Sequence, residues 1–191
     1  GYGKWITLSG ILTFLYEQGY DAFVGWFLGA ATLGLYQMAY RFSNAPATEI
    51  TGTISQVLFP VYSQIQDDKE TLSKTYFTAL KLIFVITIPM SVGIIVVAHP
   101  FVDVFLGDKW LPAVTVLQIL TVWGFVRAVS SASGSIFKAV GVPDYITKIQ
   151  IVNVLLLAVL IFPLTSNLGA RGTAVAVVAA TTVGGSLGMY F

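Results

Sequence analysis

Long apolar runs, separated by short segments that contain glycine, proline or charged residues, extend along the whole chain. The hydrocarbon core of a bilayer is about 30 Å thick, and roughly 20 helical residues can cross it. The runs reach that length, and they lack the period-two alternation of membrane β-barrel strands. The pattern therefore predicts six membrane-spanning helices at residues 4–28, 35–63, 75–98, 111–140, 145–165 and 173–191.

The segments between the predicted spans are short. Residues 29–34 begin and end with glycine and predict a tight turn, and the charged residues 64–70 predict a solvated loop. Residues 99–109 contain an apolar run too short to cross, so we expect it at the membrane interface with His99 solvated. Short connections of this kind favour a single up-and-down helical lobe.

The composition agrees with this pattern. Of the 191 residues, 56% are hydrophobic and 10% are charged, whereas a soluble domain carries about 25% charged residues. The absence of cysteine and the single histidine exclude a thiolate or imidazole metal cluster, and a net charge of +1 without a basic stripe excludes nucleic acid. We predict an all-α, multi-pass protein of the cytoplasmic membrane that holds no cofactor.

Basic residues are distributed unequally between the two predicted sides of the membrane. Cytoplasmic loops and helix ends carry an excess of lysine and arginine. The outer side has Lys109 and Arg171, and the predicted cytoplasmic side has Lys4, Lys69, Lys74, Lys81, Lys138 and Lys148.

Five charged residues fall inside the predicted spans: Glu17, Asp21, Arg41, Glu49 and Arg127. A charge in the hydrocarbon core costs several kcal/mol unless it is paired or hydrated. Counted from the turn at residues 29–34, Asp21 and Arg41 have similar depth on adjacent helices, which predicts an ion pair of either structural or functional importance. Glu17 lies one turn deeper than Asp21 on the same face.

Arg127 has no evident acid at equal depth, and several serines follow it at positions 130–135. We therefore predict that Arg127 faces a cavity filled by water or ligand. Glu49 either forms hydrogen bonds with neighbouring threonines while protonated or has a functional role, and the same alternatives apply to Glu17. The glycines and alanines of the span at 173–191 predict close helix packing.

Sequence motifs of enzymes are absent: there is no Gly-x-Ser-x-Gly elbow, no His-Glu-x-x-His pair and no phosphate-binding glycine loop with lysine. The sequence therefore predicts a protein without catalytic residues.

Four segments resemble a known transporter family. They are DAFVGWFLGAATLGLYQMAYR at 21–41, ISQVLFPVYS at 54–63, LQIL at 117–120 and KAVGVP at 138–143. In this order they are similar to the C-terminal lobe of polysaccharide transporters, the O-antigen and teichuronic-acid flippase-like proteins of the multidrug/oligosaccharidyl-lipid/polysaccharide exporter superfamily.

The resemblance implies a two-lobe, alternating-access exporter whose substrate is an oligosaccharide on a polyprenyl pyrophosphate. Only the second lobe matches, so we expect the chain to be a piece of a longer protein that needs an N-terminal lobe to complete its cavity. Membrane lipid and the lipid-linked oligosaccharide are the expected partners.

Residue roles follow from the resemblance together with charge. Arginine suits phosphate because its planar fork donates two hydrogen bonds, so we assign Arg41 and Arg127, with Glu49, to substrate binding. Glu17 and Asp21 are assigned to coupling with protons or sodium ions. The alternatives are a multidrug or small-cation antiporter of the same superfamily, a membrane enzyme acting on lipid-linked sugars, and a structural membrane subunit; the two arginines argue against a cation as cargo.

Overall fold

The structure is a computed structural model that describes the backbone of residues 2–190. Side chains are described over the same range, apart from those of residues 2, 45–47, 49–51, 55 and 187–190. Within these limits the chain is helical and contains no strand. The helices are α1 (Tyr2–Leu28), α2 (Ala30–Gln64), α3 (Lys69–Phe105), the short η1 (Asp108–Trp110), α4 (Ala113–Ala139), α5 (Asp144–Leu168) and α6 (Ala170–Tyr190).

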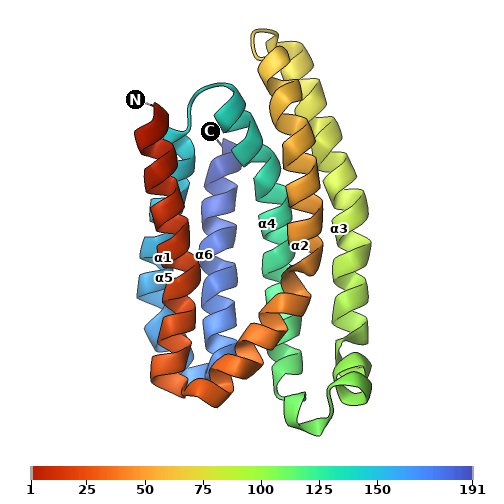
Figure 1. Cartoon of the computed structure of the whole chain (residues 1–191), viewed down its shortest axis with the longest axis vertical. Helices are drawn as coiled ribbons and strands as arrows, with labels where there is room; N and C mark the ends of the chain where they lie inside the picture. The colour runs from red at the N-terminus through yellow and green to blue at the C-terminus, as the bar shows by residue number, and fades with distance from the viewer. Residues whose placement is uncertain (1, 191) are drawn as a thin grey trace.

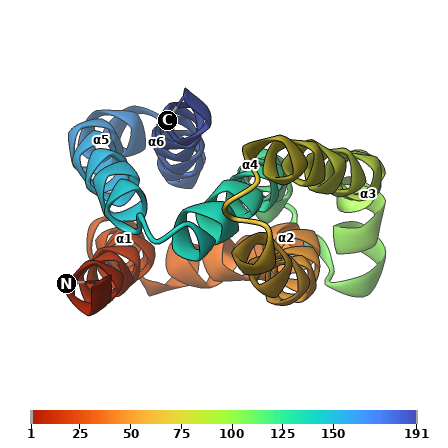
Figure 2. The same ribbon diagram turned by 90° about the horizontal axis from the view of Figure 1, so that it is seen from above.

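The helices run up and down and form two groups around α4. Figure 1 shows α2 and α3 reaching beyond the other helices at the end that holds their connecting loop. Seen from above, α4 lies between α2 and α3 on one side and α1, α5 and α6 on the other (Figure 2). Helix α4 packs on α2, α3 and α6, so the residues of its two faces connect the groups.

Two of the connections consist of single glycines. Gly29 separates α1 from α2 with φ +87°, and Gly169 separates α5 from α6 with φ +60°. These values lie in the region that glycine adopts without a steric penalty. Each glycine therefore reverses the chain within one residue and makes its two helices antiparallel neighbours.

Helix α3 begins with a side-chain cap. The Asp68 carboxylate accepts hydrogen bonds from the backbone N–H groups of Glu70 and Thr71, both at 3.1 Å. The Thr71 hydroxyl donates to the same carboxylate, and its hydrogen bond lowers the pKa of Asp68. This cap fixes the end of the charged α2–α3 loop, which lies outside the predicted membrane spans.

The apolar core lies where α4 meets α1, α2 and α6. Trp123 and Leu120 of α4 are buried against Tyr20 of α1, Tyr36 of α2 and Val177 of α6. Large apolar side chains elsewhere point outward. On α3 and α5, Val85, Val104 and Val159 are each at least 70% exposed, as expected for surfaces that lipid covers.

Among the residues that the structure describes, three helices are long and apolar enough to cross a membrane by length and composition: α3, α4 and α5. In the most apolar window of α3 only 17% of the residues are buried inside the bundle. A helix that is apolar yet mostly unburied needs an apolar solvent. The predicted fold class, an all-α membrane lobe, is confirmed.

Some predicted boundaries are wrong. The turn predicted at residues 29–34 consists of Gly29 alone, because glycine at φ +87° needs no further residue to reverse the chain. Residues 99–105, expected as a separate interfacial segment, continue α3, which passes through Pro89 and Pro100. Prolines are tolerated inside membrane helices because neighbouring groups can compensate for the lost hydrogen bond.

Lys69 and Lys148 lie at the same end of the bundle, beside the α2–α3 and α4–α5 connections (Figure 1). From the excess of lysines there, we predict that both face the cytoplasm. Cysteines placed at either site should resist a membrane-impermeant thiol reagent added to intact cells and react after the cells are opened. A cysteine in place of Lys109, at the opposite end, is the control that should react in intact cells; the reverse labelling pattern would invert the topology.

Candidate functional site

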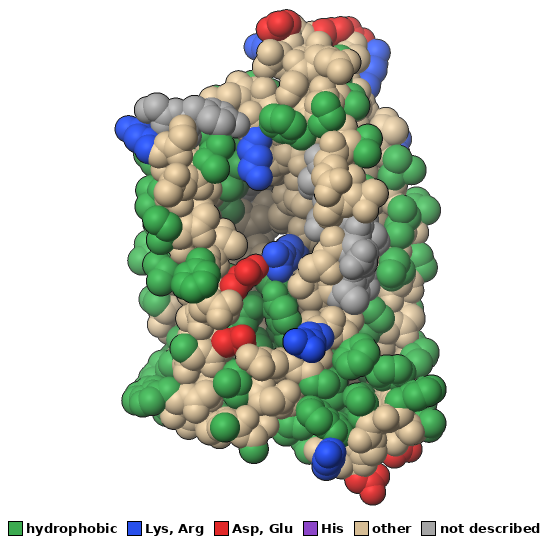
Figure 3. All heavy atoms as spheres, in the orientation of Figure 1, with side chains coloured by type: hydrophobic (Ala, Val, Ile, Leu, Met, Phe, Trp, Pro, Cys, Tyr) green, Lys and Arg blue, Asp and Glu red, His purple; other side chains and the backbone are tan. Residues whose placement is uncertain are grey.

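A cavity of about 380 Å³ lies between α1, α4, α5 and α6. Figure 3 shows a hollow on the face that carries α1 and α2, with basic and acidic side chains at its edge. The polar residues that line the cavity are Thr13, Tyr16, Glu17, Arg127, Ser130, Ser131, Ser133, Lys138, Gln150, Asn153 and Thr181.

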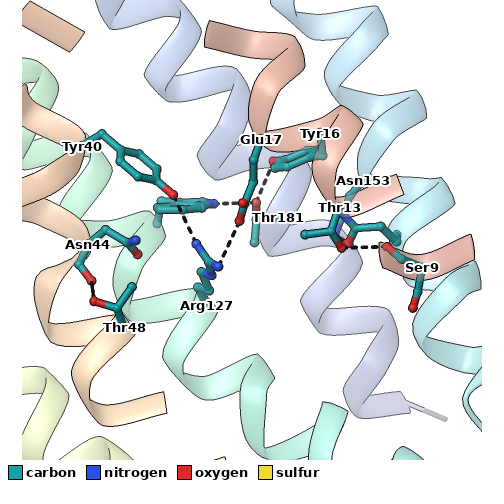
Figure 4. A network of polar contacts seen from close by, with 12 residues as sticks. Ser9, Thr13, Tyr16, Glu17, Tyr40, Asn44, Thr48, Arg127, Asn153 and Thr181 are labelled. Atoms are coloured by element: carbon teal, nitrogen blue, oxygen red, sulfur yellow. Dashed lines mark hydrogen bonds and ion pairs between the residues drawn. The ribbon is translucent and has the colours of Figure 1, made fainter. Parts of the chain in front are cut away.

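Arg127 is the central cation of this cavity. Its Nη2 lies 3.0 Å from Oε1 of Glu17, and its Nη1 donates to the Tyr40 hydroxyl at 3.4 Å (Figure 4). The guanidinium also lies 5.1 Å from the ring centroid of Trp123, within range of a cation–π contact. The Arg127 and Glu17 side chains are 36% and 29% exposed, so both are only partly covered by the described residues.

The prediction that Arg127 has no acid at its depth is wrong, because Glu17 is that acid. Glu17 precedes Gly29 by 12 residues and Arg127 follows Ala113 by 14. At 1.5 Å per residue these positions are roughly 18 and 21 Å from the same end of the bundle. Arg127 does line a cavity, and the prediction that water or a ligand fills that cavity stays a prediction.

A buried network holds the Trp123 ring beneath Arg127. The indole N–H of Trp123 donates to the Thr181 hydroxyl at 3.0 Å, and that hydroxyl lies 2.9 Å from the Tyr16 hydroxyl. Thr181 donates in turn to the Val177 carbonyl at 2.8 Å. Trp123 is 2% exposed. The orientation of the ring under the guanidinium is therefore set by α1 and α6 together.

Asn153 on α5 is a polar group that the sequence analysis missed. It is buried, its amide donates to Gln150 at 3.4 Å, and its Oδ1 has no hydrogen-bond partner within the described residues. Gly184 on α6 faces that oxygen so closely that a Cβ there would overlap it. An asparagine inside the apolar run at 145–165 was the signal in the sequence.

Three serines after Arg127 line the cavity. Ser130 and Ser131 donate hydrogen bonds to backbone carbonyls of their own helix, and the Ser133 hydroxyl lies 2.8 Å from the Tyr76 hydroxyl, where either group can be the donor. Their oxygens remain able to accept hydrogen bonds from water or a hydroxylated ligand.

The predicted ion pair between Asp21 and Arg41 is wrong: no ion pair joins them in the described structure, and Asp21 accepts a hydrogen bond from Gln37 at 3.2 Å. The cause is the register of the turn. Asp21 precedes Gly29 by eight residues and Gln37 follows it by eight, so these two are level across the hairpin. Arg41 lies one turn further along α2, is exposed and does not line the cavity.

Glu49, the remaining predicted site residue, lies on α2, but its side chain is outside the described part of the chain. Its assignment to substrate binding stays a prediction.

Residues 1–115 match the family profile described as polysaccharide biosynthesis protein. The lipopolysaccharide biosynthesis protein WzxC of Escherichia coli K12 is 33% identical over 138 residues, which are 72% of this chain and 28% of WzxC. The teichuronic acid biosynthesis protein TuaB of Bacillus subtilis 168 is 28% identical over 121 residues, which are 63% of this chain and 25% of TuaB. The chain thus spans well under half the length of these curated relatives.

Solved structures show the same fold. An outward-facing multidrug resistance MATE family transporter of the MOP superfamily superposes with a TM-score of 0.76 at 17% identity, covering 96% of this chain and 42% of that one. A MOP superfamily transporter from Pyrococcus furiosus also has a TM-score of 0.76, at 18% identity. At this low identity the match shows the fold alone, which is that of a helical lobe.

The apolar helices and the relatives place this chain in the cell membrane as a multi-pass protein. Because its first 115 residues match the family profile, the chain belongs to the polysaccharide biosynthesis protein family.

Proposed function

We propose that the chain is one lobe of an alternating-access exporter that moves a polyprenyl-pyrophosphate-linked oligosaccharide across the cytoplasmic membrane. The names of the relatives support this class of substrate, and the transporter fold supports the mechanism. The single observation that carries the proposal is the partly exposed arginine in a polar cavity near the middle of α4. The complete substrate path would need the remaining, N-terminal part of such a transporter.

Arg127 would bind the pyrophosphate. A pyrophosphate that enters a medium of low dielectric constant needs a fixed cation, and arginine presents a rigid fork of N–H donors to phosphate oxygens. Glu17 and the Trp123 ring orient the fork before the substrate arrives. The phosphate would then replace the carboxylate as the partner of the guanidinium.

Glu17 would couple this exchange to proton movement. When ionised it competes with the substrate for Arg127, and when protonated it releases the guanidinium. The charged side chains that line the same cavity are Arg127 and Lys138, from α4. Asp21, hydrogen-bonded to Gln37, is the second carboxylate that we assign to proton or sodium coupling.

An antiporter of drugs or small cations is the second candidate, since the solved structures that match include multidrug transporters. Such a protein needs cavity carboxylates free to bind a cation. Here Glu17 pairs with Arg127 at 3.0 Å, and Lys138 lines the same cavity as a second cation, so the positive charge of the lining exceeds the negative charge and favours anionic cargo. The third candidate, a membrane enzyme, would need a long loop to carry catalytic acids, whereas the described connections are short, the longest being residues 106–112 with η1 inside.

Reconstitution tests the proposal. The full-length protein in liposomes should make a polyprenyl-pyrophosphate-linked oligosaccharide, loaded in one leaflet, accessible to a glycosidase on the other side. Inverted vesicles that contain the protein should not accumulate ethidium. Ethidium transport without glycan translocation would replace the proposal with the cation antiporter, and conversion of the glycan into a different product would identify an enzyme.

A further inference from the structure

A second hollow, an apolar groove of about 380 Å³, lies on the opposite group of helices from the polar cavity, where α2, α3 and α4 meet. No charged or hydrogen-bonding side chain lines it. Its walls include Phe42 of α2, Met90, Gly93, Val97 and Phe101 of α3, and Leu117 of α4.

The groove runs along α3. From Met90 to Phe101 it follows α3 for roughly 16 Å, at 1.5 Å per residue. At one end the rings of Phe42 and Phe101 meet edge to face, with centroids 5.1 Å apart. Gly93 is exposed, and an added Cβ there would contact no atom within 4 Å, so the groove is open at this residue. This length suits an extended hydrocarbon chain.

A cation is the sequence neighbour of one residue of the groove wall. Arg41 precedes Phe42 in α2, its side chain is exposed, and it forms no ion pair with any described carboxylate. A positive charge near an apolar groove complements an amphiphile that has an anionic head and a hydrocarbon tail. The groove and Arg41 together therefore match both halves of such a molecule.

We propose that this groove binds the polyprenyl tail of the substrate, with Arg41 contacting the first phosphate. The inference rests on the proposed function. Arg41 lies roughly 16 Å along α2 from Ala30, inside the predicted membrane span. A phospholipid of the bilayer keeps its phosphate in the headgroup layer, outside the hydrocarbon core. A phosphate at the level of Arg41 must therefore belong to a lipid that the protein is moving, which selects the polyprenyl substrate over the surrounding phospholipid.

Binding to the purified full-length protein tests the inference, with undecaprenyl phosphate as the probe and native mass spectrometry as the readout. Gly93→Leu places a side chain in the groove and should weaken binding about tenfold, the loss expected when roughly two methylene groups are excluded from an apolar site. Gly19→Leu, at an exposed glycine of α1 with equally open space, should leave binding unchanged.

The two halves of the ligand can be separated. Arg41→Gln should weaken binding of undecaprenyl phosphate about tenfold and leave binding of uncharged undecaprenol unchanged, whereas Gly93→Leu should weaken both. Unchanged binding of both lipids by Gly93→Leu overturns the inference, and so does an equal loss of phosphatidylglycerol, which would assign the groove to bilayer lipid. A photoreactive residue in place of Val97 supplies a readout that does not depend on Gly93: it should crosslink to undecaprenyl phosphate, and one in place of the outward-facing Val85 should not.

This binding assay is independent of transport. A protein that binds undecaprenyl phosphate in the groove but moves no glycan contradicts the proposed function and leaves the groove assignment standing. If the protein moves glycan but its Gly93→Leu variant binds both lipids normally, the groove assignment is contradicted and the proposed function is not.

Discussion

Replacing Arg127 with alanine should abolish polysaccharide export by the full-length protein while the protein stays folded in the membrane. The substitution removes the guanidinium that Glu17, Tyr40 and Trp123 orient toward the cavity. Loss of a charge-assisted contact to a desolvated partner costs about 2–5 kcal/mol, which corresponds to a loss of at least about 30-fold in affinity. Complementation of a strain that lacks its flippase, with the protein quantified in the membrane fraction, measures the effect.

Arg127→Lys should keep the charge and still impair export. Lysine is a point charge without the planar fork, so it cannot hold two phosphate oxygens in the way arginine does. We expect an intermediate loss, about tenfold. Export at the wild-type level would show that any cation suffices at this position.

The double variant Glu17→Gln with Arg127→Ala separates function from stability. Arg127→Ala alone leaves the Glu17 carboxylate without its partner, which destabilises the fold. Replacing Glu17 as well removes that unpaired charge, so the double variant should regain thermal stability and still fail to export. If the double variant exports normally, Arg127 serves only to neutralise Glu17.

For the ion pair of Glu17 and Arg127, the sequence predicts the depth of each residue but not the contact between their helices. The depth of each residue follows from helical rise, and the two depths agree to within about 3 Å. The sequence does not say that α1 and α4 touch, because 110 residues separate the pair and short loops predict contacts only between consecutive helices. Adjacency of distant helices is set by packing, and only the structure supplies it.

The hairpin of α1 and α2 shows a different kind of error. Its existence and its antiparallel direction are predicted correctly, but the assumed turn is too long by about one helical turn. Because of that error, the sequence predicts Arg41 as the partner of Asp21, whereas the partner in the structure is Gln37. A single glycine at φ +87° suffices for the reversal, and two glycines five residues apart do not reveal which one turns the chain.

The hydrogen bonds that hold Trp123 next to Arg127 could not be predicted from composition. The small residues at 173–191 predict close helix packing. Gly184 and Gly185 confirm it, because an added Cβ at either would crowd Asn153 or Ser130. Thr181 in the same span joins Trp123 and Tyr16 in the buried network. A threonine that bonds its own helix and one that orients a neighbouring ring look identical in sequence.

Gly172→Ala should produce the largest loss of stability among alanine substitutions at the glycines that the structure describes. Gly172 lies in the first turn of α6, and an added Cβ would overlap the Leu164 carbonyl and approach the Thr165 nitrogen to 2.9 Å. Both are backbone atoms of α5, so no side chain can rotate to relieve the overlap, and α5 and α6 must separate. The hydrogen bond between the Thr165 and Thr173 hydroxyls, 2.8 Å long, would lengthen with them.

The expected cost is about 1–3 kcal/mol, the range for overpacked interiors. It exceeds the roughly 1 kcal/mol that alanine gains over glycine inside a helix. Thermal unfolding of the purified protein in detergent measures the sum of these two effects. Gly19→Ala is the matched control, because Gly19 is an exposed position within α1 where an added Cβ meets nothing within 4 Å. Only the gain in helix propensity applies there, so Gly19→Ala should raise the midpoint of unfolding while Gly172→Ala lowers it. If both variants unfold at a higher temperature than the parent, α5 and α6 are not in backbone contact at Gly172.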